Sequence, residues 1–303
     1  MKALIIGFGS IGKRHFNILS GFNEITSIDV VTKQSLAQIT HFSKLTEIKN
    51  LNIYDYFIIS SETIKHFEQL NYICSKVENK KILVEKPLYD KSHKDIKTTN
   101  QIFTAYNLRF HPIIEKINHL LQTEKVYYAN IICGQYLPSW RAGQDYTQSY
   151  SADINQGGGV LRDLSHELDY SRWLFGDFEE IKYINSKLSD LAINSDDIFT
   201  AIAVTKNRTI VNLSIDYISK IAMRKIIIHT QNITIEADII NNTLVTADKG
   251  LNKTIIEVEK IDSNYTYLKM HKAIITNNLE VICSYDEANK IMDTIENITY
   301  KEL

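Results

Sequence analysis

The N-terminal stretch A-L-I-I-G-F-G-S-I-G-K-R-H, residues 3–15, decides the fold. Its apolar residues predict a buried strand, and a helix is expected from Ser10 to Leu19. The turn between them has a G-x-G-x-x-G pattern, in which the glycines allow a tight turn, close approach to a pyrophosphate and close helix–strand packing. Because the chain has only 11 glycines, a dinucleotide site is favoured over incidental glycines. The residues expected to bind the cofactor here are Gly7, Phe8, Gly9, Ser10, Ile11 and Gly12.

Outward from this turn, strand-like and helical segments alternate. E-I-T-S-I-D-V-V-T (24–32), D-Y-F-I-I-S-S (55–61) and K-I-L-V-E-K (81–86) are typical of strands, whereas residues 63–77 have apolar residues at helical spacing. Such alternation predicts a parallel sheet covered by helices on both faces. Residues 1–110 are therefore expected to form a Rossmann dinucleotide-binding domain of the doubly wound α/β class.

The pattern changes after Pro112. A helix is expected over 113–121, a strand over 126–136, an irregular aromatic stretch as far as Gly159, and then one strong helix. Residues 181–258 contain repeated β-rich segments that predict a mainly antiparallel sheet. Two helices, around 267–276 and 285–298, follow. Residues 111–303 are expected to form an α/β substrate and oligomerisation domain, whose C-terminal helix can pack back on the first domain.

Composition excludes several classes of protein. The net charge is −2, and 23% charged and 44% hydrophobic residues are typical of a soluble globular protein without nucleic-acid or membrane partners. The apolar runs are too short to span a bilayer, and no secretion signal is recognised. Cys74, Cys133 and Cys283 are scattered without metal-type spacing. A cytoplasmic protein without a bound metal is expected.

The end of the second strand bears on the choice of dinucleotide. NAD-binding domains usually place an acidic residue there to bind the ribose hydroxyls. Asp29 lies inside the strand, which ends instead on Thr32 and Lys33, a hydroxyl and a cation that suit a 2′-phosphate. NADP is therefore favoured over NAD, the alternative being that Lys33 is an ordinary surface lysine.

A second glycine cluster, Gly157–Gly159, precedes the helix L-R-D-L-S-H-E-L-D-Y-S-R-W-L-F. On a continuous helix, the apolar residues Leu161, Leu164, Leu168 and Phe175 share one face. The opposite face groups Asp163, His166, Asp169, Tyr170 and Trp173. A lone helical histidine is usually structural, but a histidine one turn from two aspartates, after three glycines, favours a functional site.

These motifs occur in an order that resembles the glucose-fructose oxidoreductase / inositol dehydrogenase (Gfo/Idh/MocA) family. They are G-F-G-S-I-G after the first strand, E-K-P at 85–87, Y-N-L-R-F-H-P at 106–112, and G-G-G-x-L-x-D with a following histidine. The resemblance covers about residues 1–176. It implies a Rossmann domain joined to an α/β domain with an open, mainly antiparallel sheet, which often forms a dimer or tetramer interface.

The resemblance also implies site residues. Lys86 is expected to reach the substrate hydroxyl beside the nicotinamide, with Pro87 after a cis peptide bond. Asp163 and His166 match the motif's acid and histidine, although the family spacing D-x-x-x-H is D-x-x-H here, so that Asp169 is an alternative partner of His166. The residues expected to line the cofactor are Ser60, Ser61, His66 and Glu85, and Arg109 is expected to bind substrate.

These residue types suit hydride transfer at a secondary alcohol. His166 can take or give the hydroxyl proton, Lys86 can stabilise charge on the oxygen, and Asp163 can orient the histidine. The family also includes reductases, so the direction of reaction is open.

The stretch Q-Y-L-P-S-W-R-A-G-Q-D-Y-T-Q-S-Y-S-A-D, residues 135–153, offers aromatic faces for sugar stacking and an arginine for a carboxylate or phosphate. The alternative is a loop that merely covers the domain junction. The loop and the helix after it look like those of family members in bacterial surface-sugar pathways, which favours a sugar, sugar acid or nucleotide-linked sugar as substrate. The substrate-binding candidates are Trp140, Arg141, Tyr146, Tyr150 and Asp169.

Two other hypotheses stay open. One is a catalytically inactive dinucleotide-binding sensor or regulatory subunit on the same fold, which would need neither Lys86 nor His166. The other is a different reductase class, such as a bilin or imine reductase, for which the aromatic loop would be unexpected. The β-rich second half predicts a homodimer or homotetramer formed through its sheet.

Overall fold

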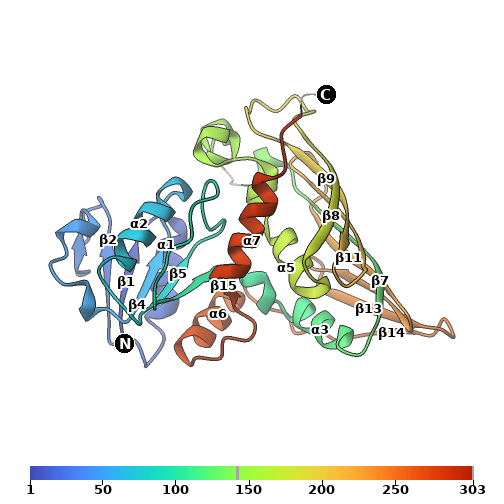
Figure 1. Cartoon of the computed structure of the whole chain (residues 1–303), viewed down its shortest axis with the longest axis horizontal. Helices are drawn as coiled ribbons and strands as arrows, with labels where there is room; N and C mark the ends of the chain where they lie inside the picture. Colours follow the sequence, from blue (N-terminus) through green and yellow to red (C-terminus); the bar gives the residue numbers. More distant parts are fainter. Residues whose placement is uncertain (141–142, 302–303) are drawn as a thin grey trace. The chain divides into compact units, whose positions relative to one another are not determined.

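The computed structural model describes residues 1–140 and 143–301 (Figure 1). The chain forms two compact units. The first comprises Met1–Phe110 and Ile261–Asp293, and the second His111–Lys260 and Thr294–Leu303. Residues Ile261–Asp293 thus join the first unit although they follow the second one in the sequence.

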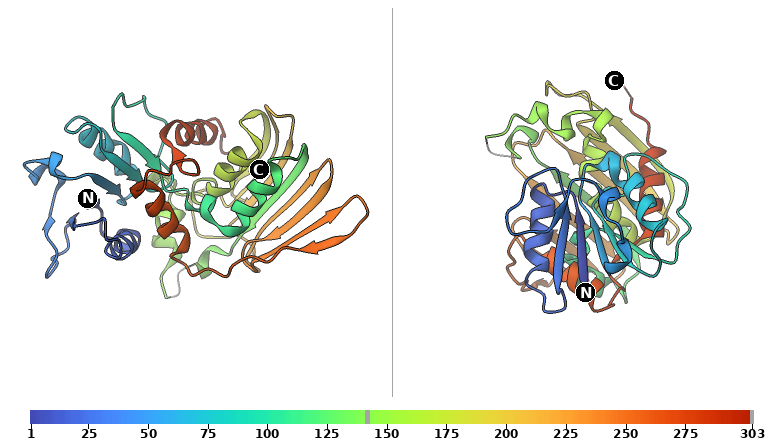
Figure 2. Two further views of the ribbon diagram at one scale, coloured as in Figure 1. Left: turned by 90° about the horizontal axis from the view of Figure 1, so that it is seen from below. Right: turned by 90° about the vertical axis from the view of Figure 1, so that its left-hand side faces the viewer.

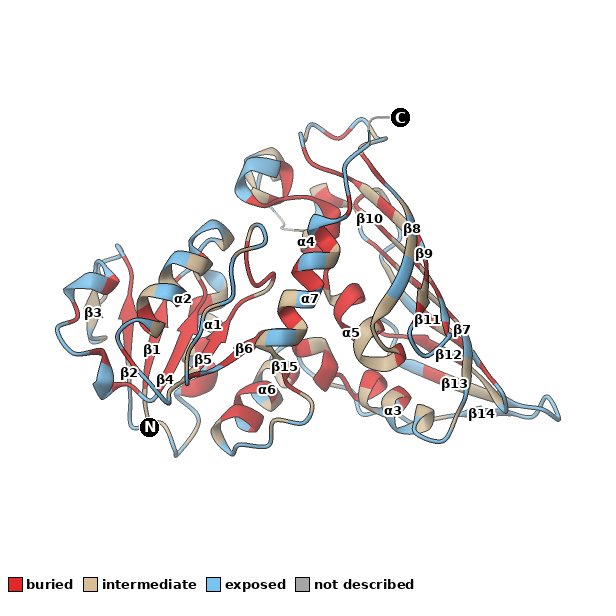
Figure 3. Ribbon diagram, in the orientation of Figure 1, coloured by how far each residue is buried: buried red, intermediate tan, exposed pale blue. Residues whose placement is uncertain are grey.

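The first unit is built on a sheet with strand order β3-β2-β1-β4-β5-β6-β15. Every neighbouring pair is parallel except β15, which runs antiparallel to β6. The strands are β1 (Lys2–Ile6), β2 (Ser27–Val31), β3 (His41–Phe42), β4 (Tyr56–Ile59), β5 (Lys81–Val84), β6 (Gln101–Thr104) and β15 (Cys283–Ser284). The central strands are almost completely buried (Figure 3), as expected of parallel strands covered on both faces.

Helices lie on both faces of this sheet, as Figure 2 shows for α1 (Ser10–Leu19) and α2 (His66–Cys74). Helix α6 (Tyr265–Ile275) packs beside α1, and α7 (Tyr285–Glu296) follows β15. The helix expected over 63–77 is shorter, because a 3-10 turn occupies Thr63–Lys65 and α2 ends at Cys74. Other 3-10 turns are at Leu45–Glu47, Leu51–Ile53 and Asn107–Phe110.

The second unit is built on an eight-stranded sheet of order β14-β13-β12-β11-β7-β10-β9-β8. All its pairs are antiparallel except β10 with β7. This sheet and the parallel sheet of the first unit confirm the predicted fold class. The strands are β7 (Val126–Gly134), β8 (Phe178–Ser186), β9 (Ile198–Thr205), β10 (Ile210–Asp216), β11 (Met223–Thr230), β12 (Ile233–Asp238), β13 (Thr243–Asp248) and β14 (Lys253–Ile255).

The helices of this unit pack on one face of its sheet (Figure 1). They are α3 (Pro112–Leu121), α4 (Val160–Asp163) and α5 (His166–Phe175). Buried residues alternate along β9 with more exposed ones, so the opposite face is the more open one. Short 3-10 turns at Leu137–Ser139, Tyr146–Gln148, Tyr150–Ala152 and Ile154–Gln156 shape the stretch between β7 and α4.

The expected continuous helix after Gly159 is wrong. Helix α4 ends at Asp163 because Leu164 leaves the helical conformation, with φ −97° and ψ 29°, and α5 begins two residues later at His166. The angular grouping of Asp163 with His166 on one helix face therefore does not hold. Helix α5 also buries Glu167, Asp169, Tyr170 and Ser171, so its polar side is not a solvent-facing surface.

Candidate functional site

The glycine-rich turn has the backbone that its pattern predicts. Gly7 has φ +95°, and a Cβ there would lie 2.6 Å from the Ser61 amide nitrogen. A Cβ on Gly12 would lie 2.1 Å from the Gly7 carbonyl oxygen, whereas a Cβ on Gly9 would meet nothing within 4 Å. Gly7 and Gly12 are thus required for close packing, and Gly9 borders open space that a ligand can enter.

The N-terminus of α1 lies in this turn and is suited to bind an anion. Its N-cap is Gly9, with no side-chain cap and no acidic residue in the first turn. The first backbone N–H groups of the helix therefore keep their hydrogen-bonding capacity, and the helix dipole adds positive potential. Phe8 packs edge-to-face on Phe16 and its carbonyl accepts from Gln34 Nε2 at 3.0 Å. The turn therefore fits the pyrophosphate of a dinucleotide.

Four predicted segments follow adjacent parallel strands at one edge of the first sheet. The turn of Gly7 follows β1, Thr32–Lys33 follows β2, Ser60–Ser61 follows β4, and Glu85–Lys86 follows β5. In open α/β sheets, ligands bind outside the carboxyl ends of the strands where the strand order reverses, which is here beside β1. The fold thus collects at one edge four segments that are spread along the sequence from Gly7 to Lys86.

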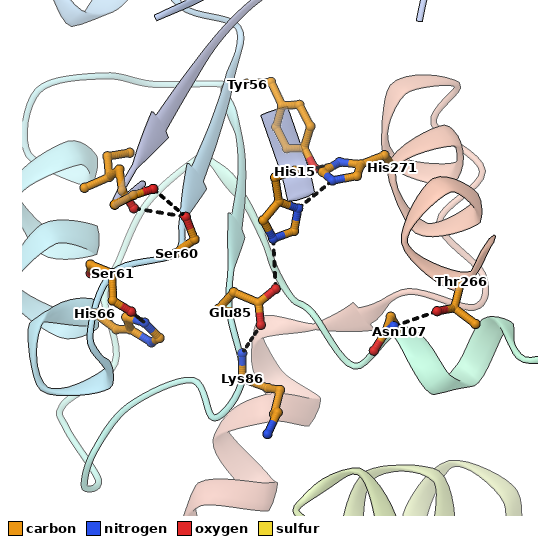
Figure 4. Close-up of polar contacts among 12 residues, drawn as sticks. His15, Tyr56, Ser60, Ser61, His66, Glu85, Lys86, Asn107, Thr266 and His271 are labelled. Carbon is orange, nitrogen blue, oxygen red and sulfur yellow. Dashed lines mark hydrogen bonds and ion pairs between the residues drawn. The ribbon is translucent and has the colours of Figure 1, made fainter. Parts of the chain in front are cut away.

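Short hydrogen bonds fix these strand ends to one another (Figure 4). Ser60 Oγ donates to the Gly7 carbonyl at 3.0 Å. The His66 ring lies with Nε2 3.1 Å from the Ser61 carbonyl and Nδ1 3.2 Å from the Pro87 carbonyl. Burial lowers the pKa of His66 below its usual value. A neutral ring has one N–H, so His66 donates to the carbonyl on one side and packs against the carbonyl on the other, between the end of β4 and the segment after the Lys86–Pro87 bond. That bond is cis, as the family resemblance implies.

The second strand offers a cation and a hydroxyl at its end. Asp29 is buried within β2, where it pairs with Lys2 Nζ at 2.8 Å and accepts from the Tyr54 hydroxyl at 2.6 Å. Thr32 is buried and Lys33 is exposed. Lys33 also contributes, after Lys65, to a lowered pKa of Glu62. Since Asp29 is held inside β2 by Lys2 and Tyr54, the side chains that follow the end of this strand are those of Thr32 and Lys33.

In the second unit, the last glycine of the triple cluster, Gly159, is explained by Asp196, which the sequence did not single out. Gly159 has φ +114°, and a Cβ there would lie 2.1 Å from Asp196 Oδ1. The other oxygen of that carboxyl accepts from the Leu161 N–H at 2.9 Å at the start of α4. Burial raises the pKa of Asp196 to about 6. No sequence signal marks this contact because it joins residues 35 positions apart.

Asp163 has a second partner that the sequence also missed. Its Oδ2 accepts from the hydroxyl of Tyr217 at 2.6 Å. The pKa of Tyr217 lies well above its ordinary value, because the hydroxyl is buried and Asp163 lies beside it. The Trp140 ring packs edge-on against Tyr217, with ring centroids 5.2 Å apart. This cluster joins the predicted aromatic loop to the residue expected to orient His166, which is half-buried at the start of α5.

The aromatic loop forms a small hollow. Its lining includes Trp140 and Tyr146, together with Leu137, Gln144 and Ser149. The Tyr146 hydroxyl accepts from the Ala192 N–H at 3.1 Å, and Tyr150 begins a 3-10 turn and is half-buried. Two of the predicted substrate residues therefore share one hollow. Arg141 lies outside the described residues.

Two other substrate candidates lie in the interior. Arg109 is 2% exposed, and its Nη1 donates to Glu287 Oε1 at 2.9 Å within the first unit. Asp169 is buried on α5. One guanidinium N–H of Arg109 is thus engaged by Glu287, and its role in substrate binding stays a prediction.

In residues 1–140 and 143–301, no cluster of three or more histidine, cysteine or acidic side chains has a metal-binding arrangement. The same part of the chain contains no helix long and apolar enough to cross a membrane.

Comparison with known proteins identifies the second unit. Residues 124–236 match the GFO/IDH/MocA C-terminal domain. This part of the chain is similar to the C-terminal domain of Gfo/Idh/MocA family proteins. This confirms the resemblance inferred from the sequence motifs. No curated protein matches the sequence.

Solved structures share the fold across nearly the whole chain. UDP-N-acetylglucosamine 3-dehydrogenase GnnA from Acidithiobacillus ferrooxidans matches with a TM-score of 0.79 and 16% identity over 98% of this chain and 96% of that one. An oxidoreductase from Agrobacterium radiobacter, in complex with NAD⁺, L-tartaric acid and magnesium, has a TM-score of 0.80 at 14% identity, covering 98% and 94%. Levoglucosan dehydrogenase with NADH and L-sorbose has a TM-score of 0.80 at 14% identity, covering 98% and 95%. At these identities the likeness concerns the fold.

Proposed function

We propose that this protein is an NAD(P)-dependent oxidoreductase that transfers hydride between a nicotinamide cofactor and a hydroxyl-bearing carbon of a sugar, sugar acid or nucleotide-linked sugar. One observation carries the proposal. The glycine turn and the uncapped N-terminus of α1 follow β1, and Glu85–Lys86 follows β5, so all lie at the same carboxyl edge of one parallel sheet with β4 between the two strands. The sugar dehydrogenases that share the fold support the substrate class. We also propose that the enzyme acts in bacterial surface-glycan metabolism.

The residues of this chain have distinct roles in the proposed reaction. The nicotinamide ring, when bound, supplies the hydride acceptor or donor. Lys86 is proposed to bind the substrate oxygen and stabilise the negative charge that develops on it. His166 is proposed to take the hydroxyl proton during oxidation and return it during reduction. Asp163, whose carboxylate Tyr217 already orients, is proposed to position His166.

NADP is the cofactor that we favour. Asp29 is buried inside β2, two residues before the end of the strand, and its Oδ2 is held by Lys2 and Tyr54, so it does not occupy the strand-end position of a ribose-binding acid. Thr32 and Lys33 offer a hydroxyl and a cation to a 2′-phosphate. NAD is the alternative, and the complexes of the Agrobacterium oxidoreductase and of levoglucosan dehydrogenase contain NAD⁺ and NADH respectively.

The test uses the full chain in two steps. NADH and NADPH are first titrated by their fluorescence, and UDP-N-acetylglucosamine, levoglucosan and L-tartaric acid are then assayed by the absorbance of reduced nicotinamide. Gly9→Asp is a sharp variant, because Gly9 has φ −72° and open space around its Cβ position, so that the fold should be kept. Its carboxylate would repel a pyrophosphate and weaken binding by about tenfold or more.

Gly9→Ala is the matched control, with the same added Cβ and no charge, and should bind more tightly than Gly9→Asp. Binding of neither dinucleotide by the wild-type protein, or equal binding by the two variants, would refute the cofactor site. Turnover of none of the three compounds would count against this substrate class while leaving the cofactor site intact.

A further inference from the structure

Four buried side chains of the first unit form a continuous hydrogen-bonded chain that ends at the Glu85–Lys86 strand end (Figure 4). Tyr56 on β4 lies with its hydroxyl 2.9 Å from His271 Nδ1. His271 Nε2, on α6, lies 2.7 Å from His15 Nδ1, on α1. His15 Nε2 lies 2.9 Å from Glu85 Oε1. Both histidines and the tyrosine are 0% exposed, and Glu85 is 7% exposed.

The chemistry of these groups determines which atom donates and which accepts in each of the three hydrogen bonds. A carboxylate can only accept hydrogen bonds, so His15 Nε2 must carry the proton that bridges to Glu85. With both rings neutral, each imidazole has one N–H, so His15 Nδ1 accepts from His271 Nε2 and His271 Nδ1 accepts from the Tyr56 hydroxyl. A cationic His15 would reverse these two hydrogen bonds. Burial holds the pKa of His271 well below its ordinary value, which agrees with a neutral His271 ring.

The surroundings of the chain support this assignment. The Tyr267 ring packs edge-on against His15, with centroids 5.6 Å apart, and the Arg14 guanidinium lies 5.2 Å from the Tyr267 centroid. The pKa of Tyr56 is raised well above its usual range by burial and by the charge of Glu85, so Tyr56 keeps its proton and can donate it. Both nitrogens of each imidazole ring make hydrogen bonds to other members of this series of side chains.

Three buried rings could pack together without a carboxylate, yet this series of hydrogen bonds ends at the carboxylate of Glu85, the residue before Lys86. The second oxygen of Glu85 accepts from the backbone N–H of Lys86 at 3.3 Å. The carboxylate thus connects the histidines directly to the backbone of the residue proposed to bind the substrate oxygen. Without the histidine donor, a buried carboxylate would lose one of its hydrogen bonds and would be free to change rotamer.

We propose that His15 and His271 are positioning residues, which hold Glu85 and the backbone of Lys86 in one orientation through a hydrogen-bond chain of fixed direction. The catalytic consequence rests on the role of Lys86 in the proposed function. Helix α6, which lies near the C-terminus of the polypeptide, thereby helps to hold the end of β5, because its His271 is linked to Glu85 through His15.

The first test measures the tautomers. The protein labelled with ¹⁵N-histidine is examined by long-range ¹⁵N–¹H correlation spectra at neutral pH, and His15→Gln and His271→Gln assign the two residues. We expect both rings to be neutral with the proton on Nε2. A proton on Nδ1 of either ring, or a cationic His15, would overturn the proposed direction.

The second test measures the strand end by hydrogen exchange and needs no substrate. His15→Leu removes both hydrogen-bonding atoms, and exchange at the Lys86 amide should rise by about tenfold or more. His15→Gln can still donate to Glu85 and accept from His271, so exchange should stay near the wild-type rate. Ile274→Ala is the control, since it removes buried apolar contacts on α6 outside the chain. It should not raise exchange selectively at Lys86, and equal exchange in the wild type and His15→Leu would overturn the positioning role.

The third test concerns turnover with whichever of UDP-N-acetylglucosamine, levoglucosan or L-tartaric acid the wild type converts. His15→Leu should lower kcat by about tenfold to a hundredfold with the dinucleotide Kd unchanged, and His15→Gln should restore much of it. An unchanged kcat in His15→Leu would overturn the catalytic consequence. If the wild type converts none of the three, the proposed substrate class fails, while hydrogen exchange still decides the positioning role.

Discussion

At the scale of single residues, Lys33 is the side chain that most directly tests cofactor choice. It is exposed at the end of β2, and Asp29 is held by other partners. Lys33→Asp should weaken NADPH binding by about tenfold or more, because a charge-assisted bond to the 2′-phosphate is replaced by repulsion. NADH binding should be kept or improved. Fluorescence titration of both cofactors measures the ratio.

Lys49→Asp is the control for this charge reversal, since Lys49 is exposed in the same unit but does not follow a strand of the parallel sheet at its carboxyl end. Affinities for the two cofactors that are equal in the wild type and unchanged by Lys33→Asp would show that Lys33 is an ordinary surface lysine.

Lys86 and His166 carry the proposed chemistry. Lys86→Ala and His166→Ala should each lower turnover by about 10² or more while cofactor binding stays nearly intact. Lys86→Arg should not restore activity, because a planar guanidinium cannot replace a compact ammonium at one oxygen. Steady-state kinetics on the converted sugar measures this, with Lys91→Ala at an exposed site as the control. Near-full activity of His166→Ala would mean that the base is a different residue.

The partner of His166 is a separate question that the same assay can answer. Asp163 and Asp169 are both buried, and Tyr217 donates to Asp163. If Asp163 orients His166, Asp163→Asn should lower kcat about as much as His166→Ala, and Tyr217→Phe should have a smaller effect in the same direction. A larger loss in Asp169→Asn than in Asp163→Asn would assign the role to Asp169.

At the scale of secondary-structure elements, the connection of Asp196 to the start of α4 gives a pH-dependent stability. The pKa of Asp196 is raised by burial from 3.8 to about 6. A group whose pKa is higher in the folded state stabilises the fold below its unfolded pKa, and this contribution is lost as pH rises through about 6. Between pH ~4.5 and ~7 the loss amounts to about 2 kcal/mol.

Asp196→Asn removes this titration, and its amide oxygen can still accept from the Leu161 N–H. The free energy of unfolding in urea, measured for both proteins at the two pH values, should therefore fall more steeply with pH in the wild type. Identical pH dependence in the two proteins would contradict the raised pKa of Asp196.

Elements also show what the sequence could and could not predict. The turn at Gly7, the alternation in the first hundred residues and the bounds of α1 follow from local patterns, because strand and helix periodicity record which face is buried. The break between α4 and α5 does not, since a single non-helical residue, Leu164, leaves the apolar periodicity almost unchanged. The contacts of Gly159 with Asp196 and of Asp163 with Tyr217 join distant segments, so no local pattern announces them.

At the scale of the whole molecule, the sequence predicts that the C-terminal helix can pack back on the first domain, but it does not reveal that this return comprises residues 261–293 and so includes α6. An amphipathic helix records that one face is buried but not which body covers it. The buried polar residues of α6 determine that the first unit covers this helix. His271 reaches His15, and Thr266 accepts from Asn107 Nδ2 at 2.6 Å (Figure 4), so α6 is matched to the first unit by specific hydrogen bonds.

The eight-stranded sheet bears on assembly, for which we propose a homodimer or homotetramer. On its more open face, isoleucines on three neighbouring strands are well exposed, namely Ile184, Ile202 and Ile210 at 43%, 58% and 44%. Ile202 on β9 lies between Lys182 on β8 and Asn212 on β10 in the strand register. A second copy of this face would cover these apolar side chains and complete a symmetric interface.

Ile202→Lys places a charge at the centre of this surface and should dissociate the oligomer, because a buried lysine without a partner opposes association. Light scattering over a range of concentrations measures the mass. Ile221→Lys is the control, since Ile221 is 79% exposed on the loop between β10 and β11 rather than on the sheet face, and it should leave the mass unchanged. A wild-type protein that stays monomeric at every concentration, or an Ile202→Lys variant that keeps the wild-type mass, would exclude this face as the interface.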